Sequence, residues 1–117
     1  MSTVAWNIQN GQLDAVKELV NAENINEIYT VRTAIQIASD YGQAEIVEYL
    51  ISVGANINTV DKYGICPLLS AVWENHLEVV KVLLAHGANR DFKAPDGTDL
   101  VDCTENEEIR NLLKNSA

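Results

Sequence analysis

The sequence Gly54-Ala55-Asn56 returns further along the chain as Gly87-Ala88-Asn89. The same step, from position 54 to position 87, joins other residues of identical type, namely Ala38 with Ala71, Glu45 with Glu78, Val47 with Val80, Leu50 with Leu83, and Gly64 with Gly97. Upstream, the segment 11–16 is similar to the segment 42–47, at a slightly shorter step. A fixed period of about 33 residues is typical of repeat architectures built from paired short helices. The sequence therefore predicts a stack of repeats.

Apolar residues with helical spacing mark the second helix of two repeats. They are Ile46, Val47, Leu50 and Ile51 in one repeat, and Val79, Val80, Leu83 and Leu84 in the next. Gly54 and Gly87 follow these segments and can adopt the left-handed backbone conformation that ends a helix. Because one helix pair cannot bury such a face alone, we expect the hydrophobic core to run along the whole stack.

Two helix starts are also recognisable. Thr33, followed by Gln36 at the third position after it, has the pattern of a capping box, which satisfies free backbone amides at a helix N-terminus. Pro67 suits the first helical turn, because its missing N–H would have had no partner there. These residues predict that the first helix of each of the two repeats begins at or directly after them.

The segment Cys66-Pro67-Leu68-Leu69-Ser70-Ala71 stands where the ankyrin-repeat family has Thr-Pro-Leu-His-x-Ala, and the segment 33–38 is a more divergent version of it. The segment 83–89 is similar to the end of the family's second helix. The chain thus resembles the ankyrin-repeat family. The resemblance implies an all-α fold, an ankyrin-repeat solenoid of about four repeats with short hairpin fingers. We expect a single domain over residues 1–117, with repeats at about 1–28, 29–61, 62–94 and 95–117.

Both ends of the chain depart from the repeat pattern. The step from Val79 to Ile109 is shorter than the regular repeat step, so the last helix pair is predicted to be about three residues short. The segment 96–108 contains six acidic residues and no basic one. These acids form either the solvated outer face that a terminal repeat needs or an acidic docking surface. The connection 24–32 lacks the glycine of the later hairpins, which predicts a shortened or irregular first finger.

The composition narrows the class of partner. The 117 residues include 8 Lys and Arg against 17 Asp and Glu, a formal net charge of −9. Such a charge repels phosphate backbones and anionic lipid headgroups, which argues against nucleic-acid and membrane binding and favours basic protein surfaces. The longest mostly apolar run, 79–85, is too short to cross a bilayer, and the first residues lack the pattern of a signal peptide. Two widely spaced cysteines fit a reduced compartment. We expect a cytoplasmic protein, with the nucleus left open.

The sequence carries no motif for catalysis. His76 and His86 are too far apart along the helix to bring two metal ligands together, and His86 stands at a helix end where it can bond terminal carbonyls. Cys66 takes a helix-start position and Cys103 is expected to be buried, so both are predicted to pack rather than to act as nucleophiles. A phosphate-binding glycine loop and a serine nucleophile elbow are missing. We therefore predict no enzyme activity, no catalytic residue, no metal and no cofactor.

Aromatic and acidic residues coincide at the positions that face the concave groove of an ankyrin stack. These positions hold Ile37, Asp40 and Tyr41 in the second repeat, Ser70, Trp73 and Glu74 in the third, and Trp6 at the place of Ile37 in the first. Aromatic side chains flanked by charge of one sign are typical of a protein-binding hot spot. In the alternative interpretation, Trp6 packs over the open end of the first repeat and Trp73 packs over its neighbour.

A narrower resemblance extends over the whole chain. It is carried by the segments 6–16, 38–43, 55–58, 61–62, 65–74 and 95–97, with Ile109, Leu112 and Leu113. Within it, Pro67-Leu68-Leu69-Ser70-Ala71-Val72 is more specific than the general ankyrin pattern. The chain is similar to the myotrophin-like proteins, small four-repeat ankyrin proteins that bind the heterodimeric actin capping protein, of alpha and beta subunits, and keep it off filament barbed ends.

This resemblance implies that the chain sequesters actin capping protein by covering a basic surface that the latter needs for actin, and so favours filament growth. The family's binding positions fall on Trp6, Asp40, Trp73 and Glu74, with Tyr41 as a further candidate. Trp73 stands where the family more often has tyrosine, which keeps an aromatic side chain of larger area. The resemblance therefore implies a groove that binds protein through these five residues.

The sequence departs from the family at three places: Ala34-Ile35-Gln36 replaces Pro-Leu-His, Asn75 replaces glycine, and the first connection is expected to be shortened. Other functions stay open from the repeat fold alone, which fits a generic ankyrin regulator of a kinase or of a transcription factor equally well. A structural adaptor or a fragment of a longer array is a third interpretation, and the short, charged last repeat argues against it. We expect a monomer that acts by steric occlusion.

Overall fold

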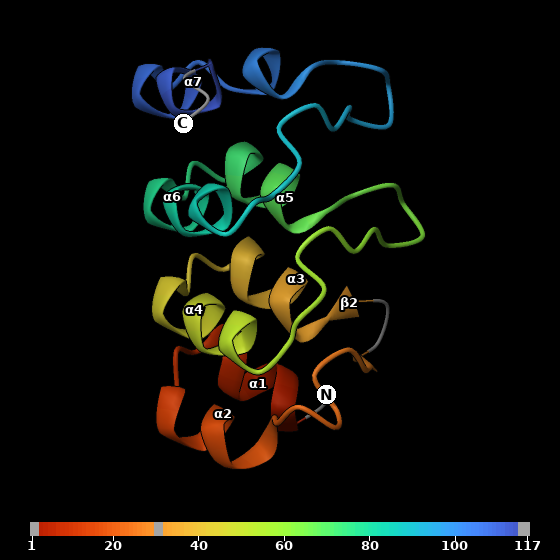
Figure 1. Cartoon of the computed structure of the whole chain (residues 1–117), viewed down its shortest axis with the longest axis vertical. Coiled ribbons are helices and arrows are strands. Elements are labelled where there is room, and N and C mark those ends of the chain that lie inside the picture. The colour runs from red at the N-terminus through yellow and green to blue at the C-terminus, as the bar shows by residue number, and fades with distance from the viewer. Residues whose placement is uncertain (1–2, 30–31, 115–117) are drawn as a thin grey trace.

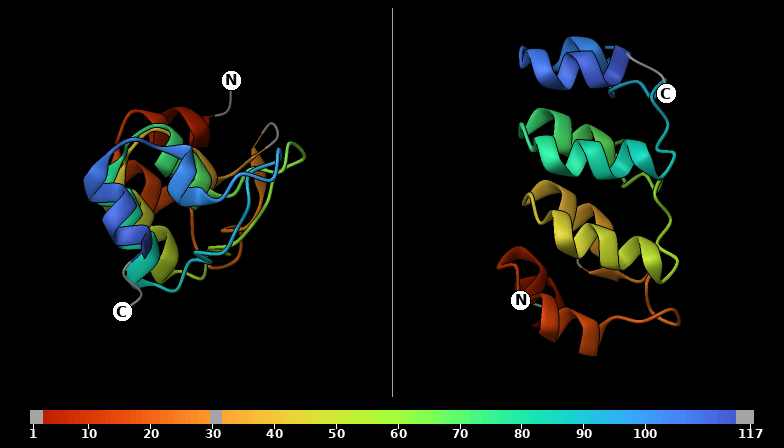
Figure 2. Two further views of the ribbon diagram at one scale, coloured as in Figure 1. Left: turned by 90° about the horizontal axis from the view of Figure 1, so that it is seen from above. Right: turned by 60° about the vertical axis from the view of Figure 1, so that its left-hand side comes forward.

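The computed structural model of the chain describes residues 3–29 and 32–114. Pairs of antiparallel helices lie one above the other along the long axis, with the N-terminal pair at one end and the C-terminal pair at the other (Figure 1). Viewed along the stack, the pairs nearly superpose and the connecting fingers project to one side (Figure 2). The particle measures 36 × 26 × 21 Å. This elongated stack confirms the predicted all-α repeat architecture.

The helices form two rows. The inner row contains α1 (Thr3–Gln9), α3 (Ala34–Asp40), α5 (Pro67–Trp73) and the 3₁₀ helix η1 (Leu100–Cys103). The outer row contains α2 (Leu13–Leu19), α4 (Ala44–Ser52), α6 (Leu77–Ala85) and α7 (Glu107–Lys114). Each inner helix packs against the next inner helix, and each outer helix packs against the next outer one, so that neighbouring repeats hold one another.

The hydrophobic core lies between the two rows and runs the length of the stack. On α4, Ile46, Val47 and Leu50 are buried, and Val79, Val80 and Leu83 repeat them on α6. The remaining members of the two predicted faces, Ile51 and Leu84, are half-buried at the edge of the core. The prediction of two equivalent apolar faces is therefore confirmed, and neighbouring repeats provide the surface that buries them.

The predicted helix boundaries are confirmed with their local causes. The Thr33 backbone N–H donates to Gln36 Oε1 at 2.9 Å, and Gln36 Nε2 donates to the Ile65 carbonyl at 3.0 Å in the next finger. At the start of α5, the Leu69 N–H donates to Cys66 Sγ at 3.4 Å, and Pro67 is the first helical residue. Each cap satisfies amides that no helical carbonyl reaches.

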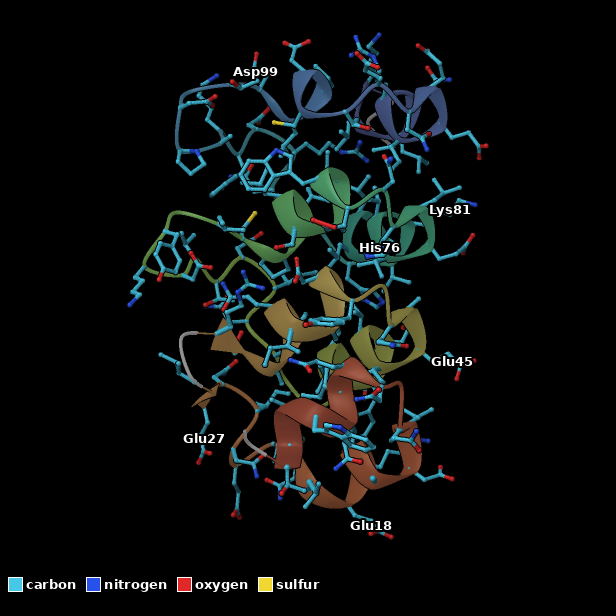
Figure 3. The ribbon with its side chains drawn as sticks, turned by 180° about the vertical axis from the view of Figure 1, so that it is seen from behind. Glu18, Glu27, Glu45, His76, Lys81 and Asp99 are labelled. Atoms are coloured by element: carbon cyan, nitrogen blue, oxygen red, sulfur yellow. The ribbon has the colours of Figure 1, made fainter. Side chains whose placement is uncertain are left out.

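Equivalent side chains at the start of each outer helix link successive repeats. Gln43 Nε2 donates to the Gln9 carbonyl at 2.9 Å, and His76 Nε2 lies 2.9 Å from the Asp40 carbonyl, which accepts the hydrogen bond. His76 is labelled in Figure 3 at the junction of the second and third repeats. The carbonyl at the end of one inner helix is thus satisfied by a side chain from the following repeat.

The fingers are linked in the same neighbour-to-neighbour way. Asn26 Oδ1 accepts a hydrogen bond from the Asn56 backbone N–H at 2.9 Å, and Asn58 Oδ1 accepts one from the Asn89 N–H at 3.0 Å. These bonds join the first finger to the second and the second to the third. Asparagine side chains therefore hold each of these fingers at hydrogen-bond distance from the previous one.

The first finger is irregular, but the prediction that it is shortened is wrong. The segments 20–33, 53–66 and 86–99 separate the successive helix pairs, so all three connections have the same length. The shortening of the first repeat falls instead on α2, which has 7 residues where α4 has 9. The finger contains a short antiparallel strand pair, β1 (Ile28–Tyr29) with β2 (Arg32–Thr33). Asparagine turns replace the glycine, because Asn21 Oδ1 accepts from the Glu23 N–H and Asn24 Oδ1 from the Asn21 N–H.

The helix pair of the terminal repeat is short, as predicted, and the shortening falls on its inner helix. Here η1 has 4 residues where α3 and α5 have 7, which accounts for the shorter step. Arg110 Nη1 donates to the Val101 carbonyl at 2.8 Å and to the Thr104 carbonyl at 3.2 Å. The carbonyls at the end of this single turn are therefore satisfied by a guanidinium from α7.

Candidate functional site

The five residues predicted to bind a partner lie on neighbouring inner helices. Trp6 is on α1, Asp40 and Tyr41 stand at the end of α3, and Trp73 and Glu74 stand at the same place on α5. Because α3 packs against both α1 and α5, these positions follow one another along the stack. We refer to the five residues together as the inner-row surface.

The three aromatic side chains of this surface are half-exposed. Trp6 is 48% exposed, Tyr41 49% and Trp73 45%. Half-exposed aromatic rings present a large apolar area at low entropic cost, the property that suits them to interfaces. In the described ranges, neither tryptophan is tucked wholly inside, so the packing interpretation does not account for their exposed faces.

The prediction that Ile37 and Ser70 face the groove is wrong. Both are 4% exposed, since α3 lies between α1 and α5, and α5 lies between α3 and η1. Trp6 occupies the repeat position of Ile37, yet α1 is the first inner helix and packs against α3 alone in the inner row. Of the three residues at this repeat position, Trp6 is therefore exposed on the groove side, whereas Ile37 and Ser70 are buried.

The charge of Asp40 is compensated within the chain. Asp40 Oδ2 lies 3.1 Å from Arg32 Nη1, and Arg32 Nε lies 3.7 Å from Asp61 Oδ2, whose side chain is only 1% exposed. Sequence reasoning did not find Arg32, because it precedes α3 and reaches Asp40 from the finger rather than along a helix face. Glu74, by contrast, is exposed, and none of the salt bridges between described residues includes it.

Trp73 borders the terminal repeat, because its indole and the Cys103 thiol line the same hollow. Burial raises the pKa of this thiol above its ordinary value, and the negative charge of Asp96 raises it further, while the indole beside it opposes the rise. Cys103 is only half-buried, which corrects the prediction that it is buried, because the single turn of η1 leaves it at the edge of the repeat. The packing interpretation of Trp73 is thus correct for one edge of the ring.

The remaining cysteine and the two histidines have structural contacts. Cys66 is buried at the start of α5, and burial raises the pKa of its thiol, which disfavours the nucleophilic thiolate. His86 Nε2 lies 3.3 Å from Glu48 Oε2 of the preceding repeat, so the predicted bond to helix-end carbonyls is replaced by a contact between repeats. Over residues 3–29 and 32–114, no group of three or more His, Cys, Asp and Glu side chains is placed to hold a metal ion. None of the helices in those ranges has the length and hydropathy to span a bilayer.

Comparison with known proteins gives the same architecture. The family model described as "Ankyrin repeats (3 copies)" matches residues 4–94. Myotrophin from Xenopus tropicalis is 47% identical over 110 residues, which cover 92% of this chain and 93% of that protein. Serine/threonine-protein kinase 12 from Arabidopsis thaliana is 31% identical over 81 residues, and the B-cell lymphoma 3 protein homolog from Mus musculus is 41% identical over 71 residues. The matched parts cover 67% and 60% of this chain, but only 17% and 16% of those two proteins.

Proposed function

This chain belongs to the ankyrin-repeat family, as a myotrophin-like member, and from that premise we propose that it binds and sequesters the heterodimeric actin capping protein. Ankyrin-repeat proteins of this kind are protein-binding regulators. The proposed action is steric: the bound chain covers a basic surface that capping protein needs for actin, and filament barbed ends stay free to grow. The proposal places this action in the cytoplasm and involves no chemical step.

The observation that carries the proposal is the row of half-exposed aromatic rings on neighbouring inner helices, beside exposed acids. Trp6, Tyr41 and Trp73 offer apolar area that a partner can bury, which slows dissociation. Glu74 and the net charge of −9 attract a basic partner and speed encounter. Figure 3 shows that acids elsewhere, such as Glu18, Glu27 and Glu45, also point outward from the surface. The molecule therefore suits a partner with a positively charged face.

The direct experiment is an actin assembly assay at barbed ends with a fixed amount of capping protein and increasing amounts of this chain. We expect filament growth to recover as the chain is added. Growth that stays blocked at saturating chain would contradict the proposal. A pull-down that recovers a kinase or a transcription factor without capping protein would favour the alternative of a generic ankyrin regulator.

Trp73→Ala tests the aromatic contribution to this binding. Loss of an aromatic hot spot costs on the order of 2 kcal/mol, so the dissociation constant for capping protein is expected to rise by about thirtyfold. Tyr63→Ala is the matched control, since Tyr63 is a 56% exposed aromatic residue on a finger. Equal effects of the two substitutions would remove Trp73 from the proposed site.

Asp40→Lys tests electrostatic attraction. The substitution replaces an acid with a base beside Arg32, and we expect slower association with capping protein, with a loss that shrinks as salt is raised. An association rate that is unchanged at low salt would exclude Asp40 from the attraction of the partner.

A further inference from the structure

A hollow lies between the third repeat and the terminal repeat, beside Trp73. Its lining comes from the end of α5, the last finger and η1, and consists of Trp73, Ala94, Asp96, Thr98, Asp102 and Cys103. We call it the Trp73 hollow. Asp99, at the end of the last finger, is labelled beside the terminal repeat in Figure 3. The hollow therefore continues the inner-row surface beyond the five residues predicted from the sequence.

The aromatic wall of the hollow lies against the terminal repeat. The Trp73 indole and the Cys103 thiol line the same hollow, and the thiol donates to the Asp99 carbonyl at 3.4 Å. The side of the ring that faces Cys103 therefore borders the terminal repeat, while 45% of the side chain stays exposed. A ring that is already packed on one side loses little conformational freedom when a partner side chain packs on it.

The carboxylates of the hollow are free of internal counterions. In the part of the chain that the structure describes, no salt bridge includes Asp96 or Asp102, and both are exposed. The Thr98 N–H donates to Asp96 Oδ1 at 3.0 Å, which orients that carboxylate. Asp99 differs, because it is paired with Lys93. The uncompensated negative charge therefore lies at the Trp73 end of the surface, whereas Asp40 is paired with Arg32.

We propose that the Trp73 hollow binds one arginine side chain of the protein partner, with the guanidinium packed on the indole between Asp96 and Asp102. A cation packs favourably on the face of tryptophan, the best of the aromatic side chains for this contact. Arginine fits better than lysine, because its planar group stacks on a ring while its N–H groups point outward to carboxylates. This inference rests on the proposed function only for the identity of the partner, since the hollow itself belongs to this chain.

The test measures the hollow without capping protein. The two indole N–H signals are followed by NMR in the full chain, with Trp73→Phe used to assign them, while hexa-arginine or hexa-lysine peptide is added. We expect the Trp73 signal to shift saturably with hexa-arginine and to show weaker binding of hexa-lysine, while the Trp6 signal serves as the internal control. A Trp73 signal that does not move, or equal affinity for both peptides, would overturn the proposal.

Two double variants that remove the same charge at different places distinguish the contribution of the hollow to peptide binding from that of the overall net charge. Asp96→Asn with Asp102→Asn is expected to weaken hexa-arginine binding by about tenfold. Glu107→Gln with Glu108→Gln removes the same charge from the exposed start of α7 and is expected to change it less than about threefold. Equal losses in the two pairs would show that only net charge matters and would overturn the proposal.

The same two pairs in the barbed-end assay distinguish this inference from the proposed function. If the double variant at Asp96 and Asp102 no longer inhibits capping protein, while the double variant at Glu107 and Glu108 still does, the arginine site and the proposed function are both supported. Inhibition that survives in that pair would overturn the arginine site for this partner and leave the proposed function intact. Peptide binding at the hollow with no inhibition by the unaltered chain would overturn the proposed function and support the hollow as a site for another basic protein.

Discussion

The second and third repeats have the same helices but different residues at their ends. Each has an inner helix of 7 residues and an outer helix of 9. The second begins its inner helix with Thr33 and Gln36, while the third begins with the Cys66 thiol and Pro67. The comparison teaches that the buried faces set where the helices run, and that different end groups can satisfy the same free amides.

The turn between inner and outer helix gives a second contrast. Gly42 and Asn75 occupy equivalent positions, and both have positive φ, at 73° and 59°. A Cβ at Gly42 would lie 2.6 Å from His76 Nδ1, whereas Asn75 has room for its side chain, and its Oδ1 accepts a hydrogen bond from Thr104 Oγ1 at 3.1 Å. The residue allowed at this turn is therefore set by what the following repeat places against it.

The largest expected effect on the free energy of unfolding tests whether the buried faces of the second and third repeats are equivalent. Leu50→Ala and Leu83→Ala each remove a fully buried side chain from the same place on α4 and α6. We expect each to lower the free energy of unfolding by about 2–5 kcal/mol, with the two values similar. Urea denaturation followed by circular dichroism measures both. Losses that differ by more than about 2 kcal/mol would contradict the view that the two faces are equivalent.

Exchanging the residues at the two turns, Gly42 and Asn75, should destabilise the second repeat more than the third. Gly42→Asn forces a side chain against the His76 ring, and we expect a loss of about 1–3 kcal/mol in the free energy of unfolding. Asn75→Gly gives up the Thr104 bond but relieves the positive φ, so a change below about 1 kcal/mol is expected. Denaturant unfolding compares the two variants, and similar losses would refute this account of the turn.

The residues that precede the two inner helices, Thr33 and Cys66, predict that the two repeats lose stability to different extents at alkaline pH. Burial raises the pKa of the Cys66 thiol, so the unfolded chain ionises this group at lower pH than the folded chain does. The stability contributed by the neutral thiol is complete below the ordinary thiol pKa of about 8.5 and is lost as pH rises through it toward the folded value. Cys66→Thr should remove this alkaline loss of stability.

The reverse exchange is the control for the thiol. Thr33→Cys places a second buried thiol at the equivalent cap, where Thr33 is buried, and should add a further alkaline loss. Thermal unfolding at several pH values from neutral to alkaline measures all three chains. Parallel pH profiles for the unaltered chain and Cys66→Thr would exclude a contribution from this thiol.

The smallest expected effect concerns the links between repeats. His76→Gln supplies an amide that can donate to the Asp40 carbonyl, as Gln43 donates to the Gln9 carbonyl. We expect a change within about 0.5 kcal/mol in the free energy of unfolding, whereas His76→Ala should cost about 1 kcal/mol. A glutamine variant as unstable as the alanine variant would show that the imidazole ring itself is needed.

The fold could be predicted because its signals are local and recur. The apolar faces around Leu50 and Leu83, the left-handed Gly54 and the cap at Thr33 each depend on residues within one turn or one helix. The length of the first finger was not predictable in this way. The sequence shows that the first repeat step is short, but the structure is needed to see that α2, rather than the finger, is shorter.

The site was predicted less completely, because its chemistry depends on contacts between repeats. The aromatic residues Trp6, Tyr41 and Trp73 could be placed from the repeat pattern alone. The pairing of Asp40 with Arg32 depends on the path of a finger, and the position of Trp73 beside Cys103 depends on the single turn of η1. Neither arrangement follows from helical periodicity, so the distribution of free charge became visible only in three dimensions.

The row of asparagine hydrogen bonds along the fingers would allow further repeats to be inserted into the stack. Each bond, Asn26 to Asn56 and Asn58 to Asn89, joins a finger only to its immediate neighbour and uses the same amide group on each level. One extra repeat unit inserted between the second and third repeats would therefore meet a matching acceptor, Asn58 Oδ1, on the second finger and a matching donor, the Asn89 N–H, on the third. The stack can therefore be lengthened by whole repeats without a change in the contacts that join one finger to the next.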